Sequence, residues 1–199
     1  METIVFASNN KHKIEEVKEI LSSYKILSLK DIGFIEDIEE NGKTFLENAL
    51  IKARATVGYL KAQNKNFIVI SDDSGLCVEA LEGAPGVFSA RYAGNHDPSA
   101  NRAKLLQKLK KHKNRNAHFE CVIVKMSIDG NYTYGVGKTQ GIILEKETGD
   151  KSFGYDCIFY SNDLRKSFGE ATSKEKNSVS HRGRAIQQCF NLSQNQNNK

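Results

Sequence analysis

The chain has 199 residues, of which 39% are hydrophobic and 27% charged, with only two prolines. This composition indicates a globular protein of one domain or two tightly joined lobes, and it excludes a disordered chain. Lysine and arginine number 29 against 24 acidic residues, a net charge of +5 that suits nucleic acid or a small polyanion such as a nucleoside triphosphate. No apolar stretch approaches the roughly 20 residues of a membrane span, and no secretory signal opens the chain. We therefore expect a cytoplasmic protein with no membrane partner.

The cysteines are too dispersed for a disulfide framework. Cys77, Cys121, Cys157 and Cys189 lie far apart, form no CxxC pair and show no metal-ligand spacing. Three of them sit in apolar runs, which is typical of buried free thiols. The pattern indicates a reduced protein.

The first unit along the chain reads as strand, polar loop and helix. Residues 3–7 are an apolar run that predicts a buried strand, and a helical stripe covers residues 14–21. Between them lies Ser8–Lys13, and the N–H groups at such a helix start form a ready phosphate site. The alternative is that Asn9 or Asn10 only caps the helix while the lysines face solvent.

An acidic loop and a long helix follow. Residues 26–29 suggest a second strand, and residues 31–41 form a loop rich in glutamate and aspartate. Thr44 and Glu47 make a capping box, which predicts a helix to about residue 63. The loop would bring Glu40 towards the next strand, or it is only a solvated connection.

That next strand carries the most distinctive chemistry. Residues 67–70 are apolar and β-branched, and we expect the strand to stop at Asp72 and Asp73. Ligands gather beyond strand ends in open α/β sheets, and Mg²⁺ would offset the repulsion between two carboxylates. The alternative is a solvated acidic turn in which Gly75 has a positive φ. Residues 77–81 read as a further strand.

The middle of the chain carries a basic helix and then a hairpin. We expect a turn at residues 83–86, and a helix over residues 100–113 with Ala103, Leu106 and Leu109 facing inward. Its lysines have no interleaved aromatic residues, so we expect a solvated face and no nucleic-acid partner. Strands at 117–128, 132–136 and 141–144, with a turn at residues 129–130, predict an antiparallel portion.

Two C-terminal stretches offer groups for ligand binding. Phe153–Asp156 would stack a base and accept from its ring N–H groups, unless its aromatics only pack into the core. Lys176, His181 and Arg182 suit an oxyanion or a purine carbonyl. On one continuous helix Lys176 and His181 would point about 140° apart. We therefore predict a helix break between them, with Ser178 or Ser180 capping the second piece.

The ordered set of these motifs resembles the inosine triphosphate pyrophosphatase family, whose members hydrolyse ITP, dITP and XTP to the monophosphate and pyrophosphate. The resemblance spans nearly the whole chain except residues 193–199, which we expect to be a disordered tail. Its motifs are Ser8–Lys13, Glu40–Gly42, Thr44–Ala49, Ser71–Leu76, Gly83–Gly86, Ser89–Tyr92, Phe153–Asp156 and Ser180–Arg182.

The resemblance implies a role for each matching residue. Asp73 is implied to accept the proton of the attacking water, and Glu40 with Asp73 to bind Mg²⁺, with Glu36 or Glu39 as substitutes for Glu40. Ser8 replaces the family's threonine in the phosphate loop, and Asn9 replaces its glycine. The implied substrate-binding residues are Ser8, Asn9, Asn10, Lys11, His12, Lys13, Ser74, Phe153, Gly154, Tyr155, Asp156, Lys176, His181 and Arg182.

The resemblance also implies a fold and an assembly. We expect an α/β fold, with residues 1–192 as a single two-lobed domain, a long central mixed β-sheet flanked by helices, an active-site cleft between the lobes, and a homodimer. His181 and Arg182 would read the 6-oxo group of the purine. A non-catalytic nucleotide or RNA-binding module, and a pyrophosphatase for modified pyrimidines, are the alternatives.

Overall fold

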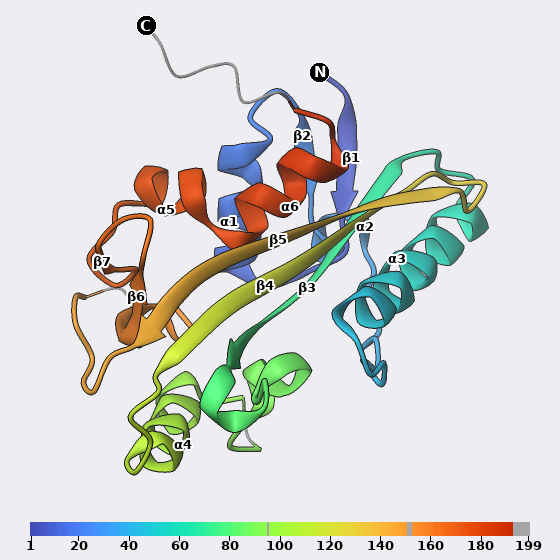
Figure 1. Cartoon of the computed structure of the whole chain (residues 1–199). Coiled ribbons are helices and arrows are strands. Elements are labelled where there is room, and N and C mark those ends of the chain that lie inside the picture. The colour runs from blue at the N-terminus through green and yellow to red at the C-terminus, as the bar shows by residue number, and fades with distance from the viewer. Residues whose placement is uncertain (95, 151–152, 193–199) are drawn as a thin grey trace, which may run out of the picture. The chain divides into compact units, whose positions relative to one another are not determined.

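The structure is a computed structural model that describes residues 1–94, 96–150 and 153–192. Its centre is a mixed seven-stranded sheet with the strand order β2-β1-β3-β4-β5-β6-β7, flanked by helices (Figure 1). The chain divides into two compact units. Unit 1 comprises residues 1–73, 122–137 and 182 onward, and unit 2 comprises residues 74–121 and 138–181. The expected α/β fold with a long mixed sheet is confirmed, while the cleft between lobes stays a prediction.

Unit 1 holds the parallel part of the sheet. β1 pairs in parallel with β2 and with the first residues of β3, and α1 and α6 lie on one side of these strands with α3 on the other (Figure 1). The core includes Val5, Ala53, Leu60, Val69 and Val124. The elements are β1 (Thr3–Phe6), α1 (Lys11–Ile20), β2 (Lys25–Leu27), α2 (Leu29–Ile32), α3 (Phe45–Ala62), the start of β3 (Ile68–Val78), the end of β4 (Asn116–Met126), the start of β5 (Tyr132–Ile143) and most of α6 (His181–Cys189).

Unit 2 holds the antiparallel part of the sheet. β6 pairs in antiparallel fashion with both β5 and β7. Leu105 of α4 packs into a core with Leu76, Phe119, Phe159 and Phe168. Besides the remainders of β3, β4 and β5, the elements are η1 (Glu79–Leu81), η2 (Gly86–Arg91), α4 (Pro98–Leu109), η3 (Asp156–Ile158), β6 (Phe159–Ser161), β7 (Lys166–Ser167) and α5 (Ser173–Val179).

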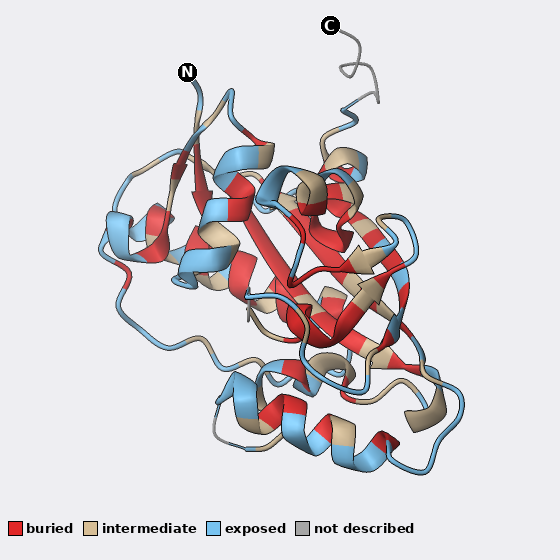
Figure 2. Cartoon of the chain, turned by 90° about the vertical axis from the view of Figure 1, so that its left-hand side faces the viewer, coloured by how far each residue is buried: buried red, intermediate tan, exposed pale blue. Residues whose placement is uncertain are grey.

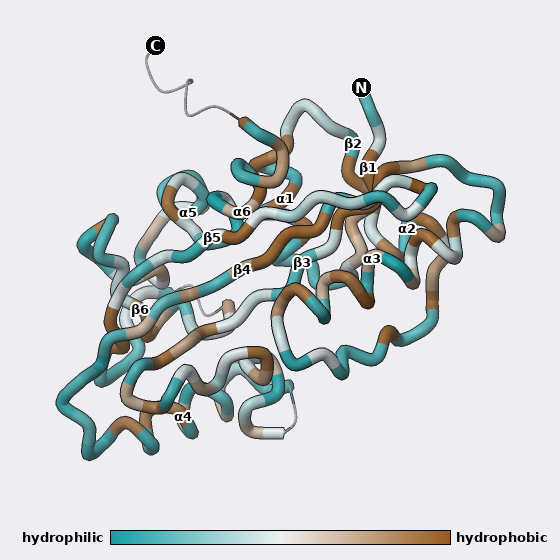
Figure 3. Tube along the Cα trace, turned by 45° about the vertical axis from the view of Figure 1, so that its right-hand side comes forward, coloured by the Kyte–Doolittle hydropathy of each residue, from teal (hydrophilic) through white to brown (hydrophobic). Residues whose placement is uncertain are grey.

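Hydrophobic patterning explains why these segments form the sheet. The middle of β4 is apolar and buried, and Figure 3 shows it as a hydrophobic stretch of the chain. Figure 2 shows the same division by burial, with buried strands and helices whose outer faces are exposed. The capping box of Thr44 and Glu47 is present at the start of α3, as predicted. No described helix is long and apolar enough to cross a membrane.

The central strand differs from the prediction in an important way. β3 does not stop at Asp72 and Asp73 but continues to Val78, so residues 77–81 do not begin a new strand. The solvated acidic turn is also wrong, since both aspartates are buried within the strand and Gly75 has no positive φ. Gly75 is required by packing instead. A Cβ there would lie 2.2 Å from the carbonyl oxygen of Gly86.

Two other element boundaries and one residue of a helix face differ from the prediction. The expected acidic loop begins with the short helix α2, and the two strands expected at 132–136 and 141–144 are one strand, β5. On α4 the predicted inward residue Leu109 is buried and Leu106 is partly buried, but Ala103 is exposed, and Arg102 and Leu105 are buried instead. The burial of Arg102 is explained by its ion pair with Glu147, at 2.7 Å. The predicted disordered tail at residues 193–199 lies outside the described residues.

The predicted helix break is confirmed. α5 ends at Val179, α6 begins at His181, and Ser180 between them is extended with φ −68° and ψ 152°. This is the backbone conformation of a helix N-cap. Within unit 1, α6 then packs directly onto the backbone of β5. A Cβ on Gly135 would lie 2.3 Å from the carbonyl oxygen of Ala185 and 2.6 Å from the amide nitrogen of Cys189.

Candidate active site

The residues expected to form the site fall into two sets, one in each unit. Unit 1 contains the Ser8–Lys13 loop, Glu40, Asp73 and Arg182. Unit 2 contains Ser74, the stretch Phe153–Asp156, Lys176 and His181. Each set is described within its own unit below.

Asp72 and Asp73 serve opposite faces of β3. Side chains alternate along a strand, so neighbouring residues point to opposite sides. Asp72 meets Lys13 of α1, whereas Asp73 meets Asn48 of α3, whose amide donates to Asp73 Oδ2 at 2.9 Å. Two adjacent carboxylates thereby enter separate hydrogen-bond networks. The uninterrupted strand, rather than a strand end, sets this geometry.

The network around Asp73 contains a second carboxylate and one ammonium group. Lys52 Nζ lies 2.9 Å from Glu40 Oε2 and 3.9 Å from Asp73 Oδ1. Glu40 and Asp73 are thus gathered around one cation, and this triad carries an excess of one negative charge. Among the three glutamates considered, Glu36 and Glu39 are exposed, while Glu40 is half-buried beside Lys52.

The pKa values of this triad follow from burial and charge. Burial raises the pKa of Asp73, and the opposing charges of Lys52 and Lys13 do not cancel this effect. For Lys52, burial acts to lower the pKa, but Asp72, Asp73 and Glu40 outweigh it and raise the pKa above its usual value. Lys52 therefore stays charged at neutral pH. A carboxylate with a raised pKa is a better proton acceptor than an exposed one.

The network around Asp72 is buried and balanced in charge. Both oxygens of Asp72 lie near Lys13 Nζ, at 3.1 and 3.0 Å, and Arg182 Nη2 donates to Asp72 at 2.8 Å. Arg182 Nη1 donates to Glu16. Burial acts to raise the pKa of Asp72, but Lys13, Arg182 and Lys52 hold it well below its usual range. Two carboxylates thus compensate two cations.

The phosphate loop is shaped by its own polar side chains. Asn10 is the N-cap of α1, because its side chain accepts from the amide of Lys13 at 3.2 Å, and Ser8 Oγ accepts from the amide of Asn10. The capping role proposed for Asn10 is thus confirmed. Asn9 instead accepts from the amide of Lys30 at the start of α2.

The two remaining loop residues, Lys11 and His12, are exposed in the first turn of α1. His12 lies 3.9 Å from Glu15 of the same helix. An exposed helix start with cationic side chains suits a phosphate group.

In unit 2 the central pair is Lys176 and Asp156. Both are buried, and Lys176 Nζ lies 2.5 Å from Asp156 Oδ2. The same ammonium group sits 5.2 Å from the ring centroid of Phe153 and 5.7 Å from that of Phe168. Asp156 therefore holds a lysine, and an N–H group of a ligand would have to share that carboxylate.

The remaining expected site residues of unit 2 are positioned by packing and by backbone conformation. Tyr155 is buried and donates to the carbonyl of Ser89 at 2.8 Å. It therefore packs in the core, which was the alternative to base stacking for this stretch. Gly154 has φ +57°, and no described atom lies within 4 Å of a Cβ built there, so backbone conformation requires the glycine. His181 is buried and stacks on Phe119 at 4.8 Å, and Ser74 is half-buried in β3.

Sequence reasoning missed three residues that organise unit 1, namely Asn48, Lys52 and Glu16. Asn48 and Lys52 are four residues apart and both face inward on α3, although both are polar. Polar side chains at helical spacing on the buried side of a helix were the available signal. On α1, Glu16 is likewise a polar residue on the buried side of the helix, next to the buried Val17. Its partner Arg182 is 166 positions away, and no local pattern could reveal it.

Comparison with known proteins places the chain among close relatives. The sequence profile of the Ham1 family matches residues 4–192. A Clostridium perfringens protein named dITP/XTP pyrophosphatase is 48% identical over 193 residues, covering 94% of this chain and 95% of the relative. The Ham1 protein structure from Staphylococcus aureus matches with a TM-score of 0.81 and 42% identity, covering 95% of this chain and 97% of that one. A HAM1 protein structure from Coxiella burnetii matches with a TM-score of 0.84 and 37% identity, covering 96% and 98%.

Proposed function

This chain belongs to the Ham1 family, and on that premise we propose that it hydrolyses dITP, ITP and XTP to the nucleoside monophosphate and pyrophosphate. The observation that carries the proposal is the near full-length similarity to a protein named dITP/XTP pyrophosphatase. The motifs that resemble the inosine triphosphate pyrophosphatases lie within the matched range.

We propose Mg²⁺ as the cofactor, held by Glu40 and Asp73. Lys52 already brings a positive charge between these two carboxylates, which supports their ability to share a cation. Carboxylate oxygens are the ligands that Mg²⁺ prefers, and the triad's excess negative charge suits a divalent ion. Bound there, Mg²⁺ would supply positive charge to the triphosphate oxygens.

The chain's own residues supply the proton transfer. Asp73 is the proposed acceptor for the proton of the attacking water, and its raised pKa suits that role. Asn48 donates to Oδ2 of Asp73 and thereby orients the carboxylate. Lys13, at the start of α1, is the proposed ligand for a phosphate oxygen, together with the exposed Lys11.

Recognition of the base is assigned to residues of unit 2 and to Arg182. A donor for the 6-oxo group would reject an amino group at that position, because a mispaired buried polar group costs about 1–3 kcal/mol. His181 and Arg182 are the proposed donors. Phe153, which lies beside Lys176, is the proposed stacking residue.

The test is a panel of pyrophosphate release from dITP, ITP, XTP, GTP, ATP and CTP, with and without Mg²⁺. We expect release from the first three in preference to the others, and only with Mg²⁺. Failure to release pyrophosphate from any of them would end the proposal, as would a preference for CTP. Binding of oligonucleotides that weakens with salt and ignores Mg²⁺ would favour a non-catalytic binding module instead.

We also propose that the protein is a homodimer and acts in the cytoplasm. The homodimer follows from the family resemblance, and the cytoplasmic location is supported by the dispersed cysteines, which suit a reducing compartment. Light scattering on the purified chain tests the first, and a monomer at micromolar concentration would contradict it.

A further inference from the structure

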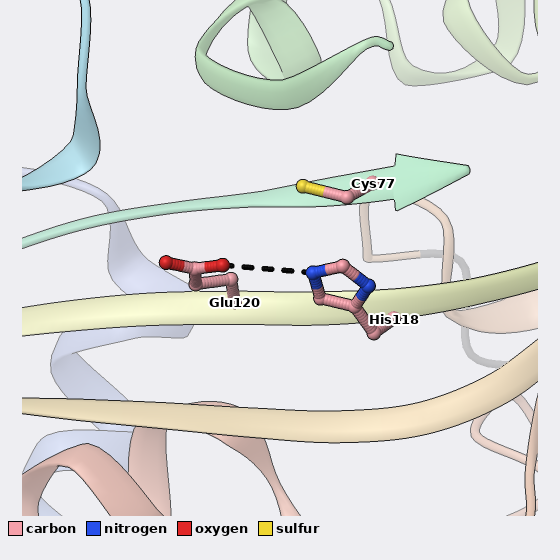
Figure 4. Close-up of side chains that lie close together, drawn as sticks. All are labelled: Cys77, His118 and Glu120. Atoms are coloured by element: carbon pink, nitrogen blue, oxygen red, sulfur yellow. Dashed lines mark ion pairs between the residues drawn. The ribbon is translucent and has the colours of Figure 1, made fainter. Parts of the chain in front are cut away.

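A mixed cluster of side chains lies on adjacent strands of unit 2, and none of its three residues is among those assigned to hydrolysis. Cys77 belongs to β3, and His118 and Glu120 belong to β4 (Figure 4). One ligand atom from each, a sulfur, a ring nitrogen and a carboxylate oxygen, lies within 4.8 Å of both others. His118 Nε2 and Glu120 Oε2 are 3.5 Å apart.

The fold explains why these three side chains meet. Leu76 and Val78 point into the core of unit 2, so Cys77 between them points to the opposite face. Phe119 enters the same core, and His118 and Glu120 on either side of it also point away. Because β3 and β4 are neighbours in the sheet, the three groups share one face.

We propose that Cys77, His118 and Glu120 form a binding site for a zinc ion. The donor set contains one sulfur, one imidazole nitrogen and one carboxylate oxygen, all of which Zn²⁺ accepts at about 2.0–2.3 Å. The sulfur and the imidazole select against hard ions such as Mg²⁺. Three protein ligands leave the fourth tetrahedral position for water or another small ligand.

Charge and access both favour a divalent ion here. All three side chains are half-buried, so an ion can enter from solvent. On coordination the thiol proton passes to solvent, and the resulting thiolate and the carboxylate together neutralise Zn²⁺. Lys138 of β5 lies 2.8 Å from Glu120. The Lys138 side chain is 50% exposed, so it can turn into solvent when the ion binds.

The geometry requires only a local contraction. Ligand atoms around a tetrahedral zinc ion are about 3.3–3.8 Å apart, given bond lengths of about 2.0–2.3 Å. The separation of His118 from Glu120 is already in this range. The remaining separations need to shorten by at most about 1.5 Å, and rotation of half-buried side chains can supply this.

Titration with Co²⁺, a spectroscopic stand-in for Zn²⁺, tests the site on the full-length protein after treatment with a chelator. We expect one Co²⁺ per chain and an ultraviolet thiolate-to-cobalt band that Zn²⁺ removes. Cys77→Ser should abolish the band. His118→Ala should weaken binding by more than about 10- to 100-fold, which is the typical loss when a residue that only hydrogen-bonds to a metal ligand is replaced. Lys138→Met should tighten binding several-fold, since it removes a competing cation.

Matched variants separate this site from other thiols and histidines. Cys189→Ser alters a buried thiol of unit 1, and His112→Ala alters an exposed imidazole, so neither should change the titration. Circular dichroism of the metal-free variants checks their folding, and Glu120→Gln provides an independent second variant. An absent thiolate band, or a band that survives Cys77→Ser, would overturn the proposal.

Discussion

Asp72 and Asp73 are adjacent in β3, yet Asp72 bonds to Lys13 and Arg182 on one face of the strand while Asp73 bonds to Asn48 on the other. The two carboxylates therefore differ in environment. Asp72 is surrounded by cations that keep its pKa far below the usual range, whereas burial raises the pKa of Asp73. Asp72 is suited to stabilise the fold through its ion pairs, and Asp73 is suited to accept a proton.

The first prediction concerns Asp73→Asn. Loss of the proposed proton acceptor should lower kcat by about 10²–10⁴-fold. Nucleotide binding should remain detectable, because the amide keeps the size of the side chain. The measurement is pyrophosphate release from ITP alongside calorimetric binding of ITP. Asp37→Asn, in the exposed loop, is the control and should behave as the unaltered protein. Near-full activity of Asp73→Asn would remove Asp73 from its role.

The second prediction concerns the metal ligands. Glu40→Gln should raise the Mg²⁺ concentration needed for half-maximal activity, because it removes one of two carboxylates gathered around Lys52. Glu36→Gln and Glu39→Gln are matched controls, since both side chains are exposed. The measurement is a Mg²⁺ titration of pyrophosphate release. An equal effect of Glu39→Gln would contradict the assignment of Glu40 as the Mg²⁺ ligand of the acidic loop.

The third prediction concerns Lys52→Met. The charge of Lys52 lowers the pKa of Asp73 against the effect of burial. Without it the pKa of Asp73 should rise further, and the acid limb of kcat/KM should move to higher pH. Lys61→Met, near the end of the same helix, removes an exposed charge and should leave the profile unchanged. An unmoved acid limb in Lys52→Met would argue that Asp73 is not the titrating base.

The fourth prediction concerns Asp72→Asn and stability. Removing one partner from a buried ionic network should cost about 3–5 kcal/mol of unfolding free energy. Because the folded pKa of Asp72 is lowered, its stabilising effect is present above the unfolded pKa of about 3.9 and is lost as pH falls below it. The difference between the two proteins in urea unfolding should therefore shrink from pH 7 to pH 3. A difference independent of pH would contradict the ionic account.

Much of the architecture was accessible from local patterns. The capping box at Thr44, the N-cap at Asn10 and the break before His181 each rest on a few neighbouring residues, and each is confirmed. The predictions were wrong where partners distant in the sequence decide whether a residue is buried. Two aspartates resemble a strand end until Lys13, Lys52 and Arg182 compensate their burial, and these lie in three other segments.

The same limit applies to the site and to α4. Ala103 was predicted to face inward on α4, but Arg102 is buried instead, and its partner Glu147 lies 45 positions away. Lys52 was overlooked for the same reason, since its two carboxylates come from a loop and from β3. Polar residues on an otherwise apolar helix face are the signal that would have exposed both.

Gly135 influences the Asp72 network through its contact with α6. α6 rests on the bare backbone of β5 at this point, and Arg182 on α6 reaches Asp72 from there. Any side chain at position 135 would lift the helix and draw the guanidinium away from the carboxylate. A random mutagenesis screen for lost activity should therefore recover substitutions at this glycine, although Gly135 is not one of the proposed substrate-binding residues.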